Sequence, residues 1–137
     1  MNGTKKRILI VDDEPDVLQV MLEALRAVPE YEVQAVSNPQ QAYQIANVRP
    51  PDLLIADYNM PLLRGDQLFL CLGVDPNDAA KCAPRPKLLL ISGAISDAEV
   101  HHLAEFVNGT AAMAKPFSVQ ELRKKVAELL ADSPSLT

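Results

Sequence analysis

The chain has 137 residues, of which 48% are apolar, and a formal net charge of −5. This length suits one domain with one core, and the apolar content excludes a disordered tail. The acidic balance argues against nucleic acid or an anionic membrane as a direct partner, because both recruit basic surface. No apolar run is long enough for a signal-peptide core or a membrane span, so we expect a cytoplasmic protein.

The first half of the chain predicts strands and helices in alternation. The first strand is a continuous apolar run, which is typical of a strand buried on both faces. Pro15 and Asn38-Pro39 are good helix starts, the former after an acidic cap, while Pro29 and Pro50-Pro51 end the helices that follow. The predicted strands lie at residues 7–11, 32–37 and 52–56, and the predicted helices at 15–28 and 39–47.

The second half continues the alternation after one irregular stretch. Residues 73–86 are long for a loop in a compact domain and carry prolines and mixed charges. Ser96 to Glu99 and Ser118 to Glu121 have the pattern of capping boxes that open helices. The predicted strands lie at 87–91 and 111–114, the predicted helices at 65–72, from 96 onward and from 118 to 131, and a frayed tail at 132–137.

Five strands that alternate with five helices predict an α/β fold, a doubly wound parallel sheet with helices on both faces. We expect an N-terminal tail at residues 1–6, one domain at 7–131 and a C-terminal tail at 132–137. Ligands of such sheets bind at the carboxyl ends of the strands, near the switch point in strand order. The functional site is therefore expected at that edge.

Polar side chains occur where four of the predicted strands end. Asp12 and Asp13 follow the first, Asp57 the third, Ser92 the fourth and Lys115 the fifth. Clustered carboxylates bind a hard cation such as Mg²⁺ through oxygen, and an ammonium and a hydroxyl beside that cation can hold phosphoryl oxygens. The arrangement predicts phosphoryl transfer onto an aspartate.

Each of these residues also has a plainer interpretation. Asp12 and Asp13 could cap a helix, Asp57 could begin a turn, and Ser92 and Lys115 could each belong to a turn. The functional reading is favoured because the residues meet at one edge, and because an aspartate after four apolar residues is costly without a cation or donor.

The cysteines point to no metal or redox site. Cys71 and Cys82 form no CxxC pair and have no zinc-like spacing to His101 or His102. Two reduced thiols are expected.

At this point the chain resembles the receiver domain of bacterial response regulators. The likeness covers residues 7 to 131, and four short motifs in the right order and spacing are specific. The matching segments are Ile8 to Glu14, Asp57 to Pro61 with Gly65, Ile91 to Ala94, and Lys115 to Phe117. The resemblance implies a flavodoxin-like fold with strand order 2-1-3-4-5.

The resemblance also implies roles. Asp57 would be the phosphoacceptor, and Asp12, Asp13, Asp57 and the backbone carbonyl of Asn59 would hold Mg²⁺. Lys115 would pair with the phosphoryl group, and Ser92 would hydrogen-bond it after transfer. The implied partners are a sensor histidine kinase or phosphotransfer protein, and a downstream protein target or a fused output domain. A homodimer through the fourth helix, fifth strand and fifth helix is possible by analogy.

Two features depart from the family pattern. Ala112 stands where the family usually has an aromatic residue, three positions before the lysine, so the way in which the signal is read out is in doubt. The long segment 73–86 is the second departure and a candidate partner surface. The departures do not touch the phosphorylation chemistry.

Three alternatives stay open or are disfavoured by particular residues. A pseudo-receiver would be a binding module that is not regulated by phosphorylation; the complete acidic set argues against it and Ala112 keeps it open. An aspartate-nucleophile phosphatase would need a second acid where Asn59 stands. A flavin module would need glycines and hydroxyls where Asp12 to Pro15 stand. The chain could also be the N-terminal receiver piece of a larger multidomain signalling protein.

Overall fold

The structure, a computed structural model, describes residues 5–58, 60, 68, 86–93 and 110–131. The predicted C-terminal tail, residues 1–4 of the predicted N-terminal tail, residues 73–85 of the irregular segment and the predicted helix from Ser96 lie outside the described residues. Lys6, expected in the N-terminal tail, is the first residue of a strand. The predicted helix at 65–72 does too, apart from Leu68, which is helical and fully buried.

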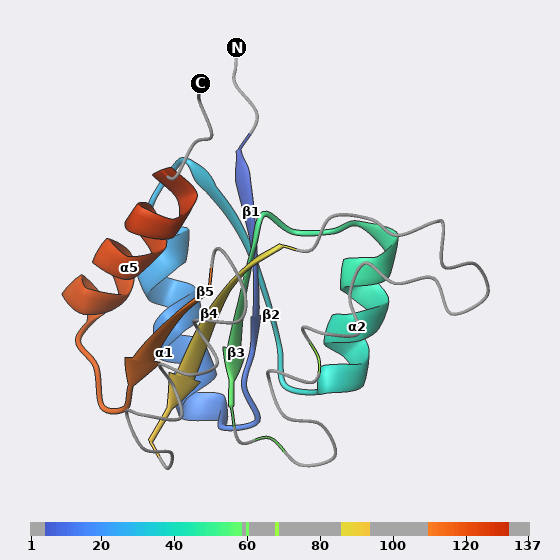
Figure 1. Ribbon diagram of the computed structural model, residues 1–137, viewed down its shortest axis with the longest axis horizontal. Coiled ribbons are helices and arrows are strands. Elements are labelled where there is room, and N and C mark those ends of the chain that lie inside the picture. The colour runs from blue at the N-terminus through green and yellow to red at the C-terminus, as the bar shows by residue number, and fades with distance from the viewer. Residues whose placement is uncertain (1–4, 59, 61–67, 69–85, 94–109, 132–137) are drawn as a thin grey trace.

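The described strands form one parallel sheet of five strands in the order β2-β1-β3-β4-β5 (Figure 1), which confirms the predicted doubly wound, flavodoxin-like arrangement. The order reverses between β1 and β3, the switch point at which such sheets bind ligands. The strands are β1 (Lys6–Val11), β2 (Tyr31–Val36), β3 (Leu53–Asp57), β4 (Lys87–Ser92) and β5 (Thr110–Ala114).

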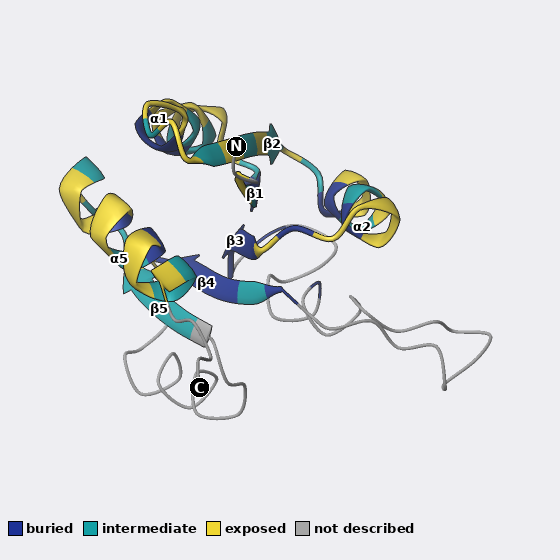
Figure 2. Cartoon of the chain, turned by 90° about the horizontal axis from the view of Figure 1, so that it is seen from above, coloured by how far each residue is buried: buried dark blue, intermediate teal, exposed yellow. Residues whose placement is uncertain are grey.

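Helices cover both faces of this sheet. In Figure 2, α1 and α5 lie on one face and α2 lies on the other. The bounds are α1 (Pro15–Arg26), α2 (Pro39–Val48) and α5 (Val119–Ala131). The described residues thus contain three of the predicted helices. Within the described part of the chain, no helix has the length and apolar character needed to cross a membrane.

The sheet separates two apolar clusters, because successive side chains of a strand point to opposite faces. In β1, Leu9 and Val11 face the α2 side, whereas Ile8 and Ile10 face α1 and α5. All four are at most 2% exposed, as expected for a central strand. The two cores hold the central strands rigidly, so the residues at their carboxyl ends have fixed positions.

The helix starts agree with the sequence signals in two cases. Asn38 accepts a hydrogen bond through Oδ1 from the backbone N–H of Gln40 at 2.7 Å, which caps α2. Ser118 and Glu121 form the predicted capping box, each side chain accepting from the other residue's backbone N–H at 3.0 Å. Each bond satisfies a donor that the first helical turn leaves unpaired.

The predicted first helix is too long at its end. It was expected to continue to Val28, but α1 ends at Arg26, with Ala27 as its C-cap. The backbone N–H of Val28 donates to the carbonyl of Leu25 at 3.1 Å, which closes one 3₁₀-type turn of four residues. The reason is Pro29, because a residue that precedes proline is disfavoured in the helical region.

At their carboxyl ends, β3 and β4 each continue one residue further than predicted, and in both strands that residue belongs to the candidate site. Asp57 is the last residue of β3 and lies opposite Ile91. Ser92 is the last residue of β4 and lies opposite Ala114. Both polar side chains are therefore carried by the sheet itself, a more rigid support than a loop.

Candidate functional site

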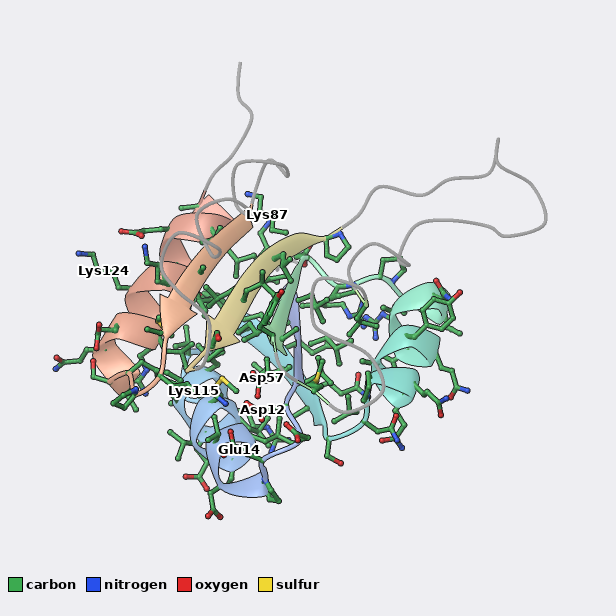
Figure 3. The ribbon with its side chains drawn as sticks, turned by 60° about the horizontal axis from the view of Figure 1, so that its bottom comes forward. Asp12, Glu14, Asp57, Lys87, Lys115 and Lys124 are labelled. Atoms are coloured by element: carbon green, nitrogen blue, oxygen red, sulfur yellow. The ribbon has the colours of Figure 1, made fainter. Side chains whose placement is uncertain are left out.

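Three carboxylates meet at the carboxyl ends of β1 and β3, where the sequence predicted them. Asp12, Asp13 and Asp57 each offer one carboxylate oxygen, and these oxygens all lie within 4.8 Å of one another. Figure 3 shows Asp12 and Asp57 beside each other below the ends of the strands. This spacing is what a single oxygen-bound cation requires.

Asp12 is the most buried member of this cluster, at 0% exposure. Its Oδ1 accepts a hydrogen bond from the backbone N–H of Glu14 at 2.8 Å, and its Oδ2 has no hydrogen-bond partner. Burial raises the pKa of Asp12 above its ordinary value of 3.8, and the charge of Asp57 adds to the rise, against the lowering effects of the Glu14 N–H and Lys115. The surroundings of Asp12 therefore disfavour its charged form.

Asp57 and Ser92 lie on neighbouring strands, both 5% exposed. The backbone continues to pair beyond Asp57, since the N–H of Tyr58 donates to the carbonyl of Ile91 at 2.8 Å. The N–H of Lys115 donates to the carbonyl of Ser92 at 2.9 Å. These bonds tie the ends of β3, β4 and β5 together, with Ser92 on the strand between those of Asp57 and Lys115.

Lys115 points into the acidic cluster (Figure 3). Its Nζ lies 3.0 Å from Asp57 Oδ2 and 3.4 Å from Asp12 Oδ2, and the side chain is only 17% exposed. Burial by itself would lower the pKa of Lys115, but its bonds to Glu14 and Asp57 and the charge of Asp12 outweigh burial and raise it. Lys115 is therefore cationic at neutral pH. The Lys115–Pro116 peptide bond is cis.

Glu14 belongs to the candidate site, although the sequence predicted no role in that site for its side chain. Its Oε1 lies 2.7 Å from Lys115 Nζ, closer than either of the two aspartates that contact this ammonium. Glu14 is the N-cap residue of α1, but its side chain makes no capping hydrogen bond, so the acidic cap expected before Pro15 is not formed by this side chain. Its place directly after Asp12-Asp13 was the available signal.

The donor set fits a magnesium ion. The ammonium of Lys115 contacts the carboxylates of Asp12, Glu14 and Asp57, and Asp13 adds a fourth carboxylate to the cluster, so the formal charge of the group is −3. Within the described residues, a buried carboxylate oxygen, Asp12 Oδ2, also lacks a hydrogen bond. Oxygen-only ligands with excess negative charge suit a hard divalent cation.

Ala112 lies in β5, as predicted. It lies opposite Leu90 and packs against the cluster on the α2 side of the sheet, whereas its neighbours Ala111 and Met113 pack on the other side. Met113 therefore points away from Ala112, as expected, and cannot replace an aromatic side chain there.

Some sequence predictions fall outside the described residues. They include Asn59, whose backbone carbonyl was predicted as a metal ligand, together with Cys71, Cys82, His101 and His102.

Known proteins with similar sequence and structure point in one direction. A family model of the response regulator receiver domain matches residues 8–127. The chain is 32% identical over 90% of its length to the sensor histidine kinase TmoS of Ectopseudomonas mendocina, and 31% identical over 93% to the transcriptional regulatory protein PrrA of Mycobacterium tuberculosis. A putative response regulator from Chloroflexus aurantiacus has a similar structure, with a TM-score of 0.73, 27% identity, and 93% of this chain and 98% of that chain covered.

The chain spans 12% of the length of the first of these relatives and 51% of the second. The family match, in contrast, covers nearly all of the chain, and the sheet order and the acidic edge are those expected of the family. The chain belongs to the response regulator receiver domain family of two-component signal transduction.

Proposed function

We propose that this chain is a phosphorylation-dependent switch in which Asp57 accepts a phosphoryl group from a histidine kinase or a phosphotransfer protein. The single observation that carries the proposal is the position of Asp57, whose Oδ2 lies 3.0 Å from the ammonium of Lys115, within an acidic cluster. A carboxylate beside a fixed cation and a metal-type donor set has the parts that phosphoryl transfer needs, namely positioning and charge neutralisation.

The transfer itself is simple in chemical terms. An oxygen of Asp57 forms a bond to phosphorus while the phosphorus–nitrogen bond of a phosphohistidine breaks. The imidazole nitrogen keeps the electron pair of that bond and, with one proton from solvent, leaves as neutral histidine. The product is an aspartyl phosphate, so the chain is not a catalyst of reactions on other molecules but acts on its own side chain.

Mg²⁺ fits the carboxylates of Asp12, Asp13 and Asp57, to which the proposal adds the backbone carbonyl of Asn59. When bound, the ion neutralises charge shared between the acceptor and the incoming phosphoryl oxygens. This neutralisation matters because a phosphoryl dianion must approach an edge of the sheet that already carries a cluster of carboxylates.

Lys115 and Ser92 complete the proposed machinery. The ammonium of Lys115 contacts Asp57 directly and is placed to hold a phosphoryl oxygen once the transfer has occurred. Ser92 ends the strand next to that of Asp57. We propose that its hydroxyl hydrogen-bonds the phosphoryl group and so draws the segment after β4 inward, which is the signal that a partner reads.

The larger assembly is also part of the proposal. Residues 7–131 would be the receiver unit, which would work in the cytoplasm and signal by protein contact, either to a separate target or to a fused output domain. TmoS is named as a kinase and PrrA as a transcriptional regulator, so related receiver units occur in both kinds of protein. A homodimer could form on the α5–β5 side of the domain.

A second candidate is a pseudo-receiver, a binding module that uses the fold without phosphorylation. Ala112 is the observation that favours it, because the strand position that usually carries an aromatic switch holds a side chain too small to change rotamer. The charge cluster is retained at the same time, and it has no structural use in a module that binds neither Mg²⁺ nor phosphate.

The proposal is tested by intact-mass measurement after incubation with acetyl phosphate and Mg²⁺. We expect the wild type to gain the mass of one phosphoryl group and Asp57→Asn to gain none. Asp52→Asn is the matched control, because Asp52 is an exposed aspartate just before β3 and should leave the gain unchanged. An Asp57→Asn protein that still gains the mass of a phosphoryl group would show that the acceptor is another residue. An unlabelled wild type that binds Mg²⁺, and that a panel of histidine kinases also fails to label, would favour the pseudo-receiver.

A further inference from the structure

The shortest ion pair of the acidic edge joins its lysine to a residue at the rim. Glu14 Oε1 and Lys115 Nζ are 2.7 Å apart, although the side chain of Glu14 is 58% exposed while the side chains of Asp12 and Asp57 are 0% and 6% exposed. The ammonium is thus shared between two buried carboxylates and one that faces solvent. Exposed ion pairs are usually weak, but this one contains a lysine whose side chain is only 17% exposed.

The position of Glu14 is fixed by its backbone. Its N–H donates to Asp12 Oδ1 at 2.8 Å, and its carbonyl accepts from the N–H of Leu18 at 3.0 Å. Its side chain makes no capping hydrogen bond to α1. The helix start therefore does not need the Glu14 carboxylate, and that carboxylate is held close to Asp12 and turned toward Lys115 (Figure 3).

Lys115 and a divalent cation need the same oxygens. Without Glu14, the ammonium could satisfy its donors only on Asp57 and Asp12 among the carboxylates it now contacts. In that position it would oppose a cation on those two ligands by direct charge repulsion. With Glu14 present, one donor of the ammonium is engaged at the rim and Asp12 Oδ2 is left without a hydrogen bond.

We propose that Glu14 is a positioning residue that holds Lys115 toward the rim and so keeps Asp12 and Asp57 available to the cation. The inference rests on the function proposed above and deepens it. The contact with Glu14 is also one that Lys115 can give up after phosphorylation, because a phosphoryl group on Asp57 offers stronger acceptor oxygens than the exposed carboxylate of Glu14. The ammonium then exchanges Glu14 for the phosphoryl group, with no covalent change at either residue.

A double-mutant cycle on Mg²⁺ affinity tests this role without any phosphoryl donor. The proteins are the wild type, Glu14→Gln, Lys115→Met and the double variant, each titrated with MgCl₂ by calorimetry at neutral pH. Asp16→Asn, made in both backgrounds, is the matched control, because Asp16 is an exposed acid in the first turn of the same helix and the substitution removes the same charge.

We expect Glu14→Gln to weaken Mg²⁺ binding by about three- to tenfold and Asp16→Asn by less than about twofold, since of these two acids it is Glu14 that bonds the ammonium. In the Lys115→Met background the effect of Glu14→Gln should fall to about twofold, because no ammonium is left to reposition. The denaturant midpoints of the metal-free proteins should be alike for Glu14→Gln and Asp16→Asn.

Equal weakening by Glu14→Gln in both backgrounds would show that Glu14 acts on the cation directly and would overturn the positioning role. An effect no larger than that of Asp16→Asn would overturn it as well. A wild type without measurable Mg²⁺ affinity would refute both the inference and the proposed metal site. A wild type that binds Mg²⁺ and shows the cycle, but never takes up a phosphoryl group, would refute only the proposed function.

Discussion

Charged side chains lie at both ends of the sheet, but the balance between positive and negative groups differs between the two ends. At the amino end, Arg7 and Arg49 share the carboxylate of Glu32, with nitrogen–oxygen distances of 3.6 and 3.4 Å. Arg7 also donates through Nη1 to the carbonyls of Arg49 and Pro50 at 2.9 and 2.7 Å. At the carboxyl end, within the described residues, the ammonium of Lys115 contacts three carboxylates, and Asp13 adds a fourth to the same cluster.

From this difference we infer a structural role for the amino end, whereas the carboxyl end carries the residues of the proposed function. At the amino end, both guanidiniums lie within ion-pair distance of Glu32, and a second carboxylate, that of Asp52, accepts from the backbone N–H of Arg7 at 2.7 Å. These contacts pin the connection between α2 and β3 to the start of β1, and they need no ligand. At the carboxyl end, buried charges are left in excess, an arrangement that costs folding free energy unless a cation arrives.

The largest effect is expected at the acidic end of the sheet, on Mg²⁺ affinity. Asp13→Ala removes one of the three clustered carboxylates, and we expect Mg²⁺ affinity to fall by roughly ten- to a hundredfold because a direct ligand and its charge are both lost. Isothermal titration measures this. Asp52→Ala removes an aspartate from the opposite end and should change the affinity by less than about twofold. An Asp13→Ala protein with wild-type affinity would refute the metal assignment.

The opposite end should respond in the opposite way. Arg7→Met keeps the aliphatic stem but removes the guanidinium, and we expect the free energy of unfolding to fall by about 1–2 kcal/mol because charge-assisted hydrogen bonds to two carbonyls are lost. Mg²⁺ affinity should stay unchanged. Urea denaturation gives the first quantity and calorimetry the second.

Lys124→Met is the control for Arg7→Met, since Lys124 lies exposed on α5, away from both charged ends (Figure 3). It removes the same charge and should cost less than about 0.5 kcal/mol. An Arg7→Met variant as stable as Lys124→Met would show that the amino-end contacts do not support the fold.

The sequence predicted the acidic end well and the amino end not at all, for a physical reason. Asp12, Asp57, Ser92 and Lys115 follow apolar runs, and parallel strands bring their carboxyl ends to one edge whatever the loops between them do. The partners of Arg7, by contrast, are backbone carbonyls of Arg49 and Pro50. Any residue type supplies a carbonyl, so no pattern in the sequence marks such a bond.

Glu14 illustrates the same limit inside the site. Its motif neighbours were predicted as ligands from their position at the end of a strand, but its bond to Lys115 joins residues 101 positions apart. That contact depends on how the chain enters α1, which the Asp12 side chain sets by accepting from the Glu14 N–H. Strand boundaries were predicted to within one residue. This is enough to place a residue at the edge of the sheet, but not to predict which way its side chain points.

The smallest expected effect concerns the pH dependence of the metal-free fold. Burial, and then the charge of Asp57, raise the pKa of Asp12 above its ordinary value of 3.8. The contribution of Asp12 to stability is therefore fully present below its unfolded pKa and is lost as the pH rises through the raised folded pKa. This sign is opposite to that of an aspartate stabilised by a salt bridge.

Asp12→Asn should remove that loss, because the amide stays neutral at every pH while its oxygen can still accept the Glu14 N–H. We expect the variant to be slightly more stable than the wild type at neutral pH in the presence of a chelator, with the difference shrinking as the pH falls toward 4. Saturating Mg²⁺ should reverse the order, since the cation stabilises only the carboxylate form. Urea midpoints across this pH range, with and without Mg²⁺, measure both arms. A variant that is less stable than the wild type without metal would show that Lys115 already balances the buried charge of Asp12. The two ends of the sheet would then differ in the residues they contain, but neither end would hold buried charge that lowers the stability of the fold.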